Sequence, residues 1–427
     1  MNYLLGLDLG TTAIKVGLFD ETGKTVTSAT QEYDLIRTSA LCVEQDAEEY
    51  WKSFTAALQI VLRKSGIDAN KIAALSISAQ GETLIPVDRE GKPRRRAIVW
   101  LDNRPQEEAE VLRAHFTDEQ IHRKTGQVSM LAMWPAAKIL WLRNHEPEVF
   151  RNTYKYLLLE DYFLYRFTGR YLAEGSLLCS TIYWDINTKQ YWPEMLQFLG
   201  ISDAQLPEIM EPGDIAGKLA PDAAKELGLP ESLTVVVGAL DQACGAIGVG
   251  NVEPGIFSES TGAALAICAM SDRILIDANR QLPCFYSGIK DMYMVHAFST
   301  GGMILRWFRD TFCSAEQAIA KLAGESDYDL IGREAATIAP GCDGLLLLPH
   351  FQGSGPPESN QYAKGVFCGV TTMHTKAHFA RAIMEAVAMT LRGMVEATEE
   401  MGISVKEIRS LSGGAKSDIW CQIKADV

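Results

Sequence analysis

Closely spaced cysteines are absent from this sequence. Nine cysteines are scattered over 427 residues, and no two of them lie within four positions of each other. This spacing excludes the paired thiols of a zinc knuckle and the dense disulfide framework of a small secreted domain. Reduced thiols in a cytoplasmic protein fit the pattern best.

Positive charge and long apolar runs are also scarce. The net charge of -14 argues against a surface for nucleic acid or for an anionic membrane. No uncharged apolar run approaches the ~20 residues of a membrane span. The first residues lack a basic segment and Asp8 interrupts their apolar run, so we expect no signal peptide. We therefore expect a cytoplasmic protein with neither nucleic acid nor membrane as a partner.

The stretch from Gly17 to Thr25 looks at first like a phosphate-binding P-loop. Five residues separate Gly17 from Gly23, whereas a P-loop has four at that point. The stretch also lies between two strand-like runs, while a P-loop joins a strand to a helix. It is therefore predicted to be a hairpin turn, with Lys24 exposed to solvent.

A better candidate for binding phosphate is Gly10-Thr11-Thr12. It follows the apolar strand "YLLGLDL" and precedes a second strand, "AIKVGLF". A turn of this kind presents backbone N–H groups and two hydroxyls, which can bind an anion. Asp8 would lie at its rim, where a carboxylate can hold Mg²⁺ through water. An ordinary hairpin turn explains the same residues.

A similar hairpin recurs more than 240 residues later. "IFSESTGAALAICAM" is a strand, a turn at Thr261-Gly262 and a strand, which suggests an internal duplication of one α/β domain. Two further turns resemble anion sites at helix starts: Asp241 in "GALDQACGAIG", and Gly413-Gly414. Asp241 is open to two interpretations, a helix N-cap or a reactive carboxylate.

Seven stretches in order resemble the FGGY family of carbohydrate kinases, within the wider actin, sugar-kinase and heat-shock ATPase fold. They are "GLDLGTTAIKVGLFD", "IVWLDNRP", "DYFLYRFTGR", "GALDQACGAIG", "STGGMILRWFRD", "YAKGVFCGVTTMHTKAHFARAIMEA" and "SGGAKSDIWCQIKAD". The resemblance implies two duplicated ribonuclease-H-like domains, residues 1–247 and 248–427, with a cleft between them. We expect the second domain to be incomplete, because a further strand and helix would follow Val427 in this family. A homodimer is the expected assembly.

The resemblance also implies roles for individual residues. Asp241 matches the catalytic base and Asp8 would lie near Mg²⁺. The positions implied for the phosphates of ATP are Thr11, Thr12, Lys15, Thr261 and Gly262. Those implied for the adenosine are Gly302, Gly413, Gly414 and Asp418. Those implied for the sugar are Gln80, Glu82, Asp102, Arg104, Trp134 and Gln242.

The expected reaction is transfer of the γ-phosphoryl of Mg·ATP to a small sugar. The stretch "AQGET" departs from the family patterns for xylulose and for glycerol, since Gly81-Glu82 follows Gln80. A ketopentose such as xylulose is the first expectation. Glycerol, another polyol, gluconate and another ketose are the alternatives. From other classes, an actin-like ATPase module and a non-catalytic nucleotide- or sugar-binding protein stay open.

Two charged clusters are expected to be solvated and without function. Arg94, Arg95 and Arg96 form a basic triplet on a loop. Glu107 and Glu108 fall in the first turn of a predicted helix, where acidic side chains favour the helix dipole.

Overall fold

The computed structural model describes residues 2–360 and 362–427. It divides into two compact units. Unit 1 comprises residues 1–244 and 285–293, and unit 2 comprises residues 245–284 and 294–427. The division at 247 and 248 that the sequence suggested stays a prediction. Within the described residues, no helix combines the length and the apolar character needed to cross a bilayer.

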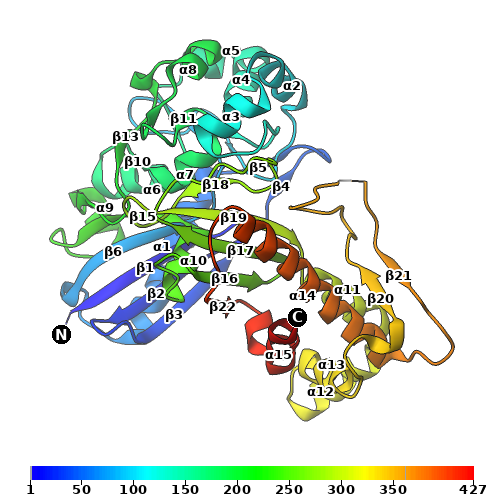
Figure 1. Ribbon diagram of the computed structural model, residues 1–427. Coiled ribbons are helices and arrows are strands. Elements are labelled where there is room, and N and C mark those ends of the chain that lie inside the picture. Colours follow the sequence, from blue (N-terminus) through cyan, green and yellow to red (C-terminus); the bar gives the residue numbers. More distant parts are fainter. Residues whose placement is uncertain (1, 361) are drawn as a thin grey trace. The chain divides into compact units, whose positions relative to one another are not determined.

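Unit 1 is built on a six-stranded sheet (Figure 1). Its strands, in spatial order, are β14 (Ile215–Lys218), β15 (Thr234–Leu240), β6 (Ile72–Ala79), β1 (Tyr3–Leu9), β2 (Ala13–Asp20) and β3 (Thr25–Glu32). Strands β1, β2 and β3 pair antiparallel, whereas β1, β6 and β15 run parallel. The parallel strands therefore end at the same edge, with Leu9, Ala79 and Leu240 in register.

Short strands and helices complete unit 1. The strands are β4 (Ile36–Arg37), β5 (Val43–Gln45), β7 (Ile85–Val87), β8 (Ala97–Ile98), β9 (Lys155–Leu157), β10 (Leu172–Glu174), β11 (Trp184–Asp185), β12 (Gln190–Tyr191) and β13 (Glu208–Met210). The helices are α1 (Ala47–Ser65), α2 (Gln106–His115), α3 (Asp118–Thr125), α4 (Pro135–His145), α5 (Pro147–Arg151), α6 (Leu159–Thr168), α7 (Gly175–Leu178), α8 (Pro193–Leu199) and α9 (Pro221–Leu227). Helix α10 (Asp241–Gly248) follows β15.

The second sheet shares part of the strand order of the first. It runs β18 (Cys284–Tyr286), β19 (Tyr293–Thr300), β17 (Ala264–Ser271), β16 (Ile256–Thr261) and β22 (Glu407–Leu411), and Phe285–Tyr293 are counted with unit 1. The order β19, β17, β16, β22 corresponds to β3, β2, β1, β6. The other elements are β20 (Leu346–Leu348), β21 (Val366–Cys368), α11 (Met303–Phe312), α12 (Ser314–Ala323), α13 (Asp327–Ala336), α14 (Lys376–Glu400) and α15 (Asp418–Asp426). The hairpin β16–β17 is antiparallel and β22 joins β16 in parallel, as β6 joins β1 in unit 1. This common order supports the duplication inferred from the two Gly/Thr turns.

Helix α1 shows how local sequence determines an element. The Asp46 side chain accepts a hydrogen bond from the Glu48 amide at its start, and Gly66 ends it with a φ of 61°. Glu48 lies in its first turn and Arg63 in its last, the order that favours the helix dipole.

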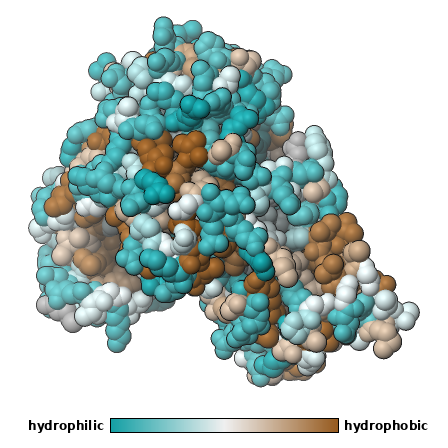
Figure 2. All heavy atoms as spheres, viewed as in Figure 1, coloured by the Kyte–Doolittle hydropathy of each residue, from teal (hydrophilic) through white to brown (hydrophobic). Residues whose placement is uncertain are grey.

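The stretch from Gly17 to Thr25 is a hairpin, as predicted, because β2 and β3 pair across it. The surface is mostly hydrophilic on the face shown in Figure 2, with apolar patches between. Single exposed apolar side chains such as Leu346 and Met389 are ordinary on a protein surface.

Candidate active site

The Gly10-Thr11-Thr12 turn joins β1 to β2 at the shared edge of the parallel strands. The Gly10 amide donates to the Ala13 carbonyl over 3.1 Å, which closes the turn. Thr11 Oγ1 accepts a hydrogen bond of 2.8 Å from Trp100 Nε1. The Gly10 carbonyl accepts from the Tyr33 hydroxyl and from Gln80 Nε2. The turn is thus held by side chains from three other segments of unit 1.

Asp8 lies just before this turn and keeps part of its carboxylate accessible. Lys15 Nζ, its cross-strand partner, lies 3.1 Å from Asp8 Oδ2, and Ser78 Oγ donates to Oδ1 over 3.3 Å. The side chain of Asp8 is 35% exposed. A partly exposed carboxylate at a strand end suits a hydrated Mg²⁺, which keeps several waters and needs few protein ligands.

Asp241 begins α10 directly after β15, at the same edge as the Gly10 turn. The pKa of Asp241 is raised to about 6, chiefly by burial, and the charge of Asp8 contributes to the rise. Hydrogen bonds from Gln242 and the charge of Lys15 act in the opposite direction. The structure therefore brings Asp8 and Lys15 close enough for their charges to act on the Asp241 carboxylate, although more than 220 residues separate Lys15 from Asp241.

Gln80 and Glu82 lie on the loop that leaves β6 at this edge. Gln80 is buried, and its amide group bonds to the Gly10 carbonyl over 3.1 Å. Glu82 has a φ of 57°, an uncommon conformation for a residue other than glycine. Burial raises the pKa of Glu82 above its ordinary value, and Asp241 adds to this, while Ser180 and Lys138 oppose it.

Lys138 is a residue of this region that the sequence analysis did not identify. It is fully buried on α4, and its Nζ donates to the carbonyls of Glu82 (2.7 Å), Val99 (3.0 Å) and Ile98 (3.4 Å). Burial lowers its pKa, and the charge of Glu82 opposes that shift. Lys138 therefore holds the Glu82 loop against the end of β8. The signal available in the sequence was one lysine in the otherwise apolar run "PAAKILWL".

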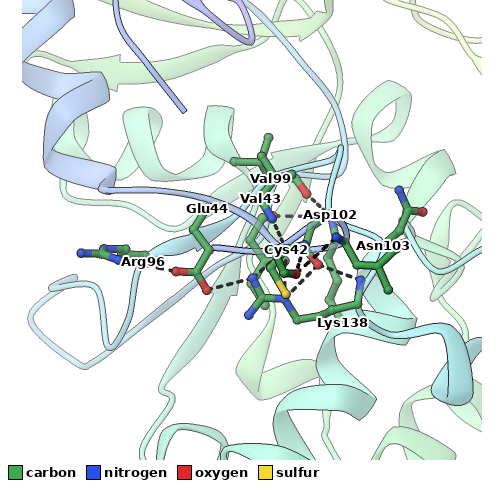
Figure 3. A network of polar contacts seen from close by, with 12 residues as sticks. Cys42, Val43, Glu44, Arg96, Val99, Asp102, Asn103 and Lys138 are labelled. Atoms are coloured by element: carbon green, nitrogen blue, oxygen red, sulfur yellow. Dashed lines mark hydrogen bonds and ion pairs between the residues drawn. The ribbon is translucent and has the colours of Figure 1, made fainter. Parts of the chain in front are cut away.

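Asp102 and Arg104 form a closed pair rather than two free polar groups. The Asp102 carboxylate is fully buried and accepts from the Val43 amide over 2.6 Å (Figure 3). Arg104 Nη2 lies 2.7 Å from Asp102 Oδ2 and 2.9 Å from Glu44 Oε1. Asp102 thus orients Arg104 and β5. A direct contact of either residue with sugar stays a prediction.

The arginine triplet and the glutamate pair were both expected to be solvated, and each contains one residue that is buried instead. Arg95 is largely buried and pairs with Glu44 and Glu146, while Arg94 and Arg96 are more exposed. Glu108 is buried, and its carboxylate has two partners there: His145 Nε2 lies 3.0 Å away and Asn144 donates to it. Tertiary packing supplies partners in both cases, which the charge pattern alone does not reveal.

Trp134 and Gln242 complete the predicted sugar positions. Trp134 is 8% exposed, precedes α4, and donates from Nε1 to the Ser129 carbonyl over 3.0 Å. Gln242 follows Asp241 on α10 and hydrogen-bonds its carboxylate. Their contact with a sugar stays a prediction.

Unit 2 contains a pocket of about 320 Å³ around the second Gly/Thr turn. Its lining residues include the predicted positions Thr261, Gly262, Gly302, Gly413 and Gly414. A Cβ at Gly302 would lie 2.4 Å from the Gly262 carbonyl oxygen, and one at Gly414 would lie 2.6 Å from Thr261 Cβ. Only glycine allows these three turns to approach so closely.

The same pocket has an apolar and aromatic part. Met384, Tyr328 and Trp420 line it beside the glycine turns. A planar base can pack on such side chains while backbone N–H groups face the phosphates. Asp418 is not among the lining residues, so the structure does not join it to the other predicted adenosine positions.

Two sheets that share the order of four strands, each with a Gly/Thr turn after the first of these strands in the chain, define the actin-like ATPase fold. Residues 3–248 match the N-terminal domain, and residues 269–427 the C-terminal domain, of the FGGY family of carbohydrate kinases. The chain belongs to this family and is a carbohydrate kinase.

The individual proteins to which the chain is similar are also carbohydrate kinases. The chain is 32% identical to xylulose kinase of Bacillus subtilis (strain 168) over 428 residues, which is 100% of this chain and 83% of that protein. It is 28% identical to gluconokinase of the same strain, with 100% and 83% covered. The ligand-bound structure of xylulose kinase from Lactobacillus acidophilus superposes with a TM-score of 0.88 at 29% identity, covering 100% of this chain and 84% of that one.

Proposed function

We propose that this kinase transfers the γ-phosphoryl of Mg·ATP to a hydroxyl of a ketopentose such as xylulose, with Asp241 as the general base. The observation that carries the proposal is the position of Asp241. It is a largely desolvated carboxylate at the edge where β1, β6 and β15 end, with its pKa raised to about 6. Such a group is ionised at neutral pH and still basic enough to accept a proton.

The reaction needs little covalent chemistry from the protein. As the sugar oxygen attacks the γ-phosphorus, its proton passes to the Asp241 carboxylate and ADP leaves. Lys15 and the amides of the Gly10 turn would face the phosphates, whose charge they offset. Mg²⁺, held through water by Asp8, would neutralise part of the phosphate charge when bound.

A neutral sugar suits unit 1 better than an aldonic acid. Carboxylates of Asp8, Glu82 and Asp241 gather near the proposed acceptor site. The nearby cations are already engaged: Lys15 lies beside Asp8, Lys138 donates to backbone carbonyls, and Arg104 is paired with Asp102 and Glu44. A substrate carboxylate would therefore meet like charge, whereas sugar hydroxyls can donate to these oxygens. The name of the xylulose kinase relative points to a ketopentose, whereas the gluconokinase relative makes gluconate the alternative to be tested.

The location and assembly of the enzyme are parts of the same proposal. All nine cysteines are free thiols, which fits a reducing compartment. We infer a cytoplasmic enzyme, where ATP is available. A homodimer stays a prediction that light scattering of the purified chain would test.

The experiment is ADP release from Mg·ATP with a panel of ketopentoses, ketohexoses, aldonic acids and polyols. We expect turnover with a ketopentose and a loss of about 10²–10⁴-fold in kcat for Asp241→Asn, which keeps the size of the side chain. Turnover with gluconate instead would overturn the substrate. An Asp241→Asn variant as active as the wild type would overturn the base.

A further inference from the structure

Two residues near the end of β15, Val237 and Gly238, interrupt the regular ladder with β6. The two strands pair in parallel from Thr234 to Val236 and again from Ala239, with a register shift between. Gly238 lies in the shift, and a Cβ there would lie 1.7 Å from the Ile77 carbonyl oxygen. The backbone of β15 therefore presses directly on β6 just before Asp241, and its amides turn to other partners.

Those partners are side chains of α6 and of the segment that begins α7, which lie against β15 (Figure 1). The Gly238 amide donates to Glu160 Oε1 over 2.7 Å. The Leu240 amide donates to Ser176 Oγ over 2.9 Å, and Ser176 Oγ donates to Glu174 Oε1 over 2.6 Å. Glu174 also accepts from the amides of Ser176 and Leu177, so its position is fixed.

We propose that Glu160, Glu174 and Ser176 are positioning residues for phosphoryl transfer, because they hold the end of β15 and so set the direction of the Asp241 carboxylate. The proposal rests on the function proposed above. None of the three side chains is exposed, so their action on the reaction would pass through the backbone of β15.

The chemistry of these buried groups is unusual for a purely structural support. Burial raises the pKa of Glu160 well above its ordinary value, and the charges of Glu174 and Asp161 add to this. A protonated Glu160 still accepts the Gly238 amide through its carbonyl oxygen. Its other oxygen, Oε2, is buried and has no hydrogen-bond partner among the described residues. Carboxyl groups buried in this way cost stability, and a functional role at the base explains why they are retained.

Proton transfer is sensitive to small displacements, which makes the proposal testable. A shift of about 1 Å in a catalytic group can cost about 10²-fold in rate. We expect Ser176→Ala to lower kcat about 10- to 100-fold, with KM for ATP unchanged. We expect Glu160→Leu to act likewise and Glu160→Gln, which keeps an oxygen acceptor, to restore most of the rate.

The matched control is Thr125→Val. The Thr125 hydroxyl is equally buried and also accepts from a backbone amide, that of Gln127 over 3.1 Å, but it belongs to α3. Both variants should lower the unfolding temperature. Only Ser176→Ala should also shift the pH at which kcat falls on the acidic side, because only this substitution changes the position of the Asp241 carboxylate. Equal kcat values and pH profiles in the two variants would overturn the proposal.

Hydrogen exchange separates this proposal from the function on which it rests. The amides of Gly238 and Leu240 should exchange faster in Ser176→Ala and Glu160→Leu, and at the wild-type rate in Thr125→Val. Wild-type protein without sugar-dependent turnover would contradict the proposed function. If the amides of Gly238 and Leu240 exchange at the wild-type rate in Ser176→Ala and Glu160→Leu, these side chains do not hold the end of β15, whatever the activity of the variants.

Discussion

Trp100 Nε1 donates a hydrogen bond of 2.8 Å to Thr11 Oγ1, across 89 residues of sequence. Trp100 belongs to the "IVWLDNRP" segment that carries Asp102 and Arg104, whereas Thr11 belongs to the turn after β1. The bond therefore ties the segment proposed to face the sugar to the turn proposed to face phosphate, within unit 1.

Trp100→Phe tests this link. A smaller aromatic ring replaces the indole and the N–H donor is lost, and a neutral hydrogen bond contributes about 0.5–1.5 kcal/mol. We expect KM for ATP to rise about two- to tenfold. Trp51→Phe is the control, because it removes the bond from Trp51 Nε1 to Glu226, away from the turn. Steady-state kinetics at saturating sugar measure both, and equal KM values would refute the link.

The pH dependence follows from Asp241. Its raised pKa of about 6 means that the base is ionised above that pH and protonated below it. We expect kcat/KM to fall about tenfold for each pH unit below 6. Lys15 lowers the pKa of Asp241, so Lys15→Met should make kcat/KM fall at a higher pH. If the fall in kcat/KM stays at the same pH or moves to lower pH, the assignment of Asp241 as the base is contradicted.

Gly302→Ala should damage nucleotide binding and spare the sugar. The new Cβ would meet the Gly262 carbonyl oxygen at 2.4 Å and push the Thr261-Gly262 turn aside. We expect the dissociation constant for ATP to rise about tenfold or more, a loss of about 1.4 kcal/mol. Gly393→Ala on α14 is the control, since its Cβ meets nothing within 4 Å. Calorimetric titration with ATP would show the contrast.

Lys424 and Glu259 form a buried ion pair in unit 2. Lys424 Nζ lies 2.5 Å from Glu259 Oε1 and 3.3 Å from Thr261 Oγ1, and Lys424 is 5% exposed at its side chain. Lys424→Met should cost about 3–5 kcal/mol, because it leaves a buried charge without its partner. The double variant Glu259→Leu/Lys424→Met should recover part of that loss. Urea unfolding of the two single variants and the double variant would test this, and strictly additive losses would argue against the pairing.

The sequence predicted the local elements around the site well. The rejection of a P-loop at Gly17, the strand-to-helix position of Asp241 and the two Gly/Thr hairpins all follow from turn chemistry and short-range periodicity. These features depend on residues that are near in sequence, so the pattern carries the information. The order of seven motifs then identified the family.

The tertiary structure decided which groups meet and which are enclosed. Lys138 reaches the Glu82 carbonyl across 56 residues, and Glu160 reaches the Gly238 amide across 78. The burial of Arg95, Asp102 and Glu108 likewise depends on segments that are distant in sequence. Sequence determined the candidate carboxylates and glycines, because their chemistry and spacing are local. Burial and long-range pairing determined their pKa values and their freedom to bind, because desolvation and charge contacts exist only once distant segments pack together.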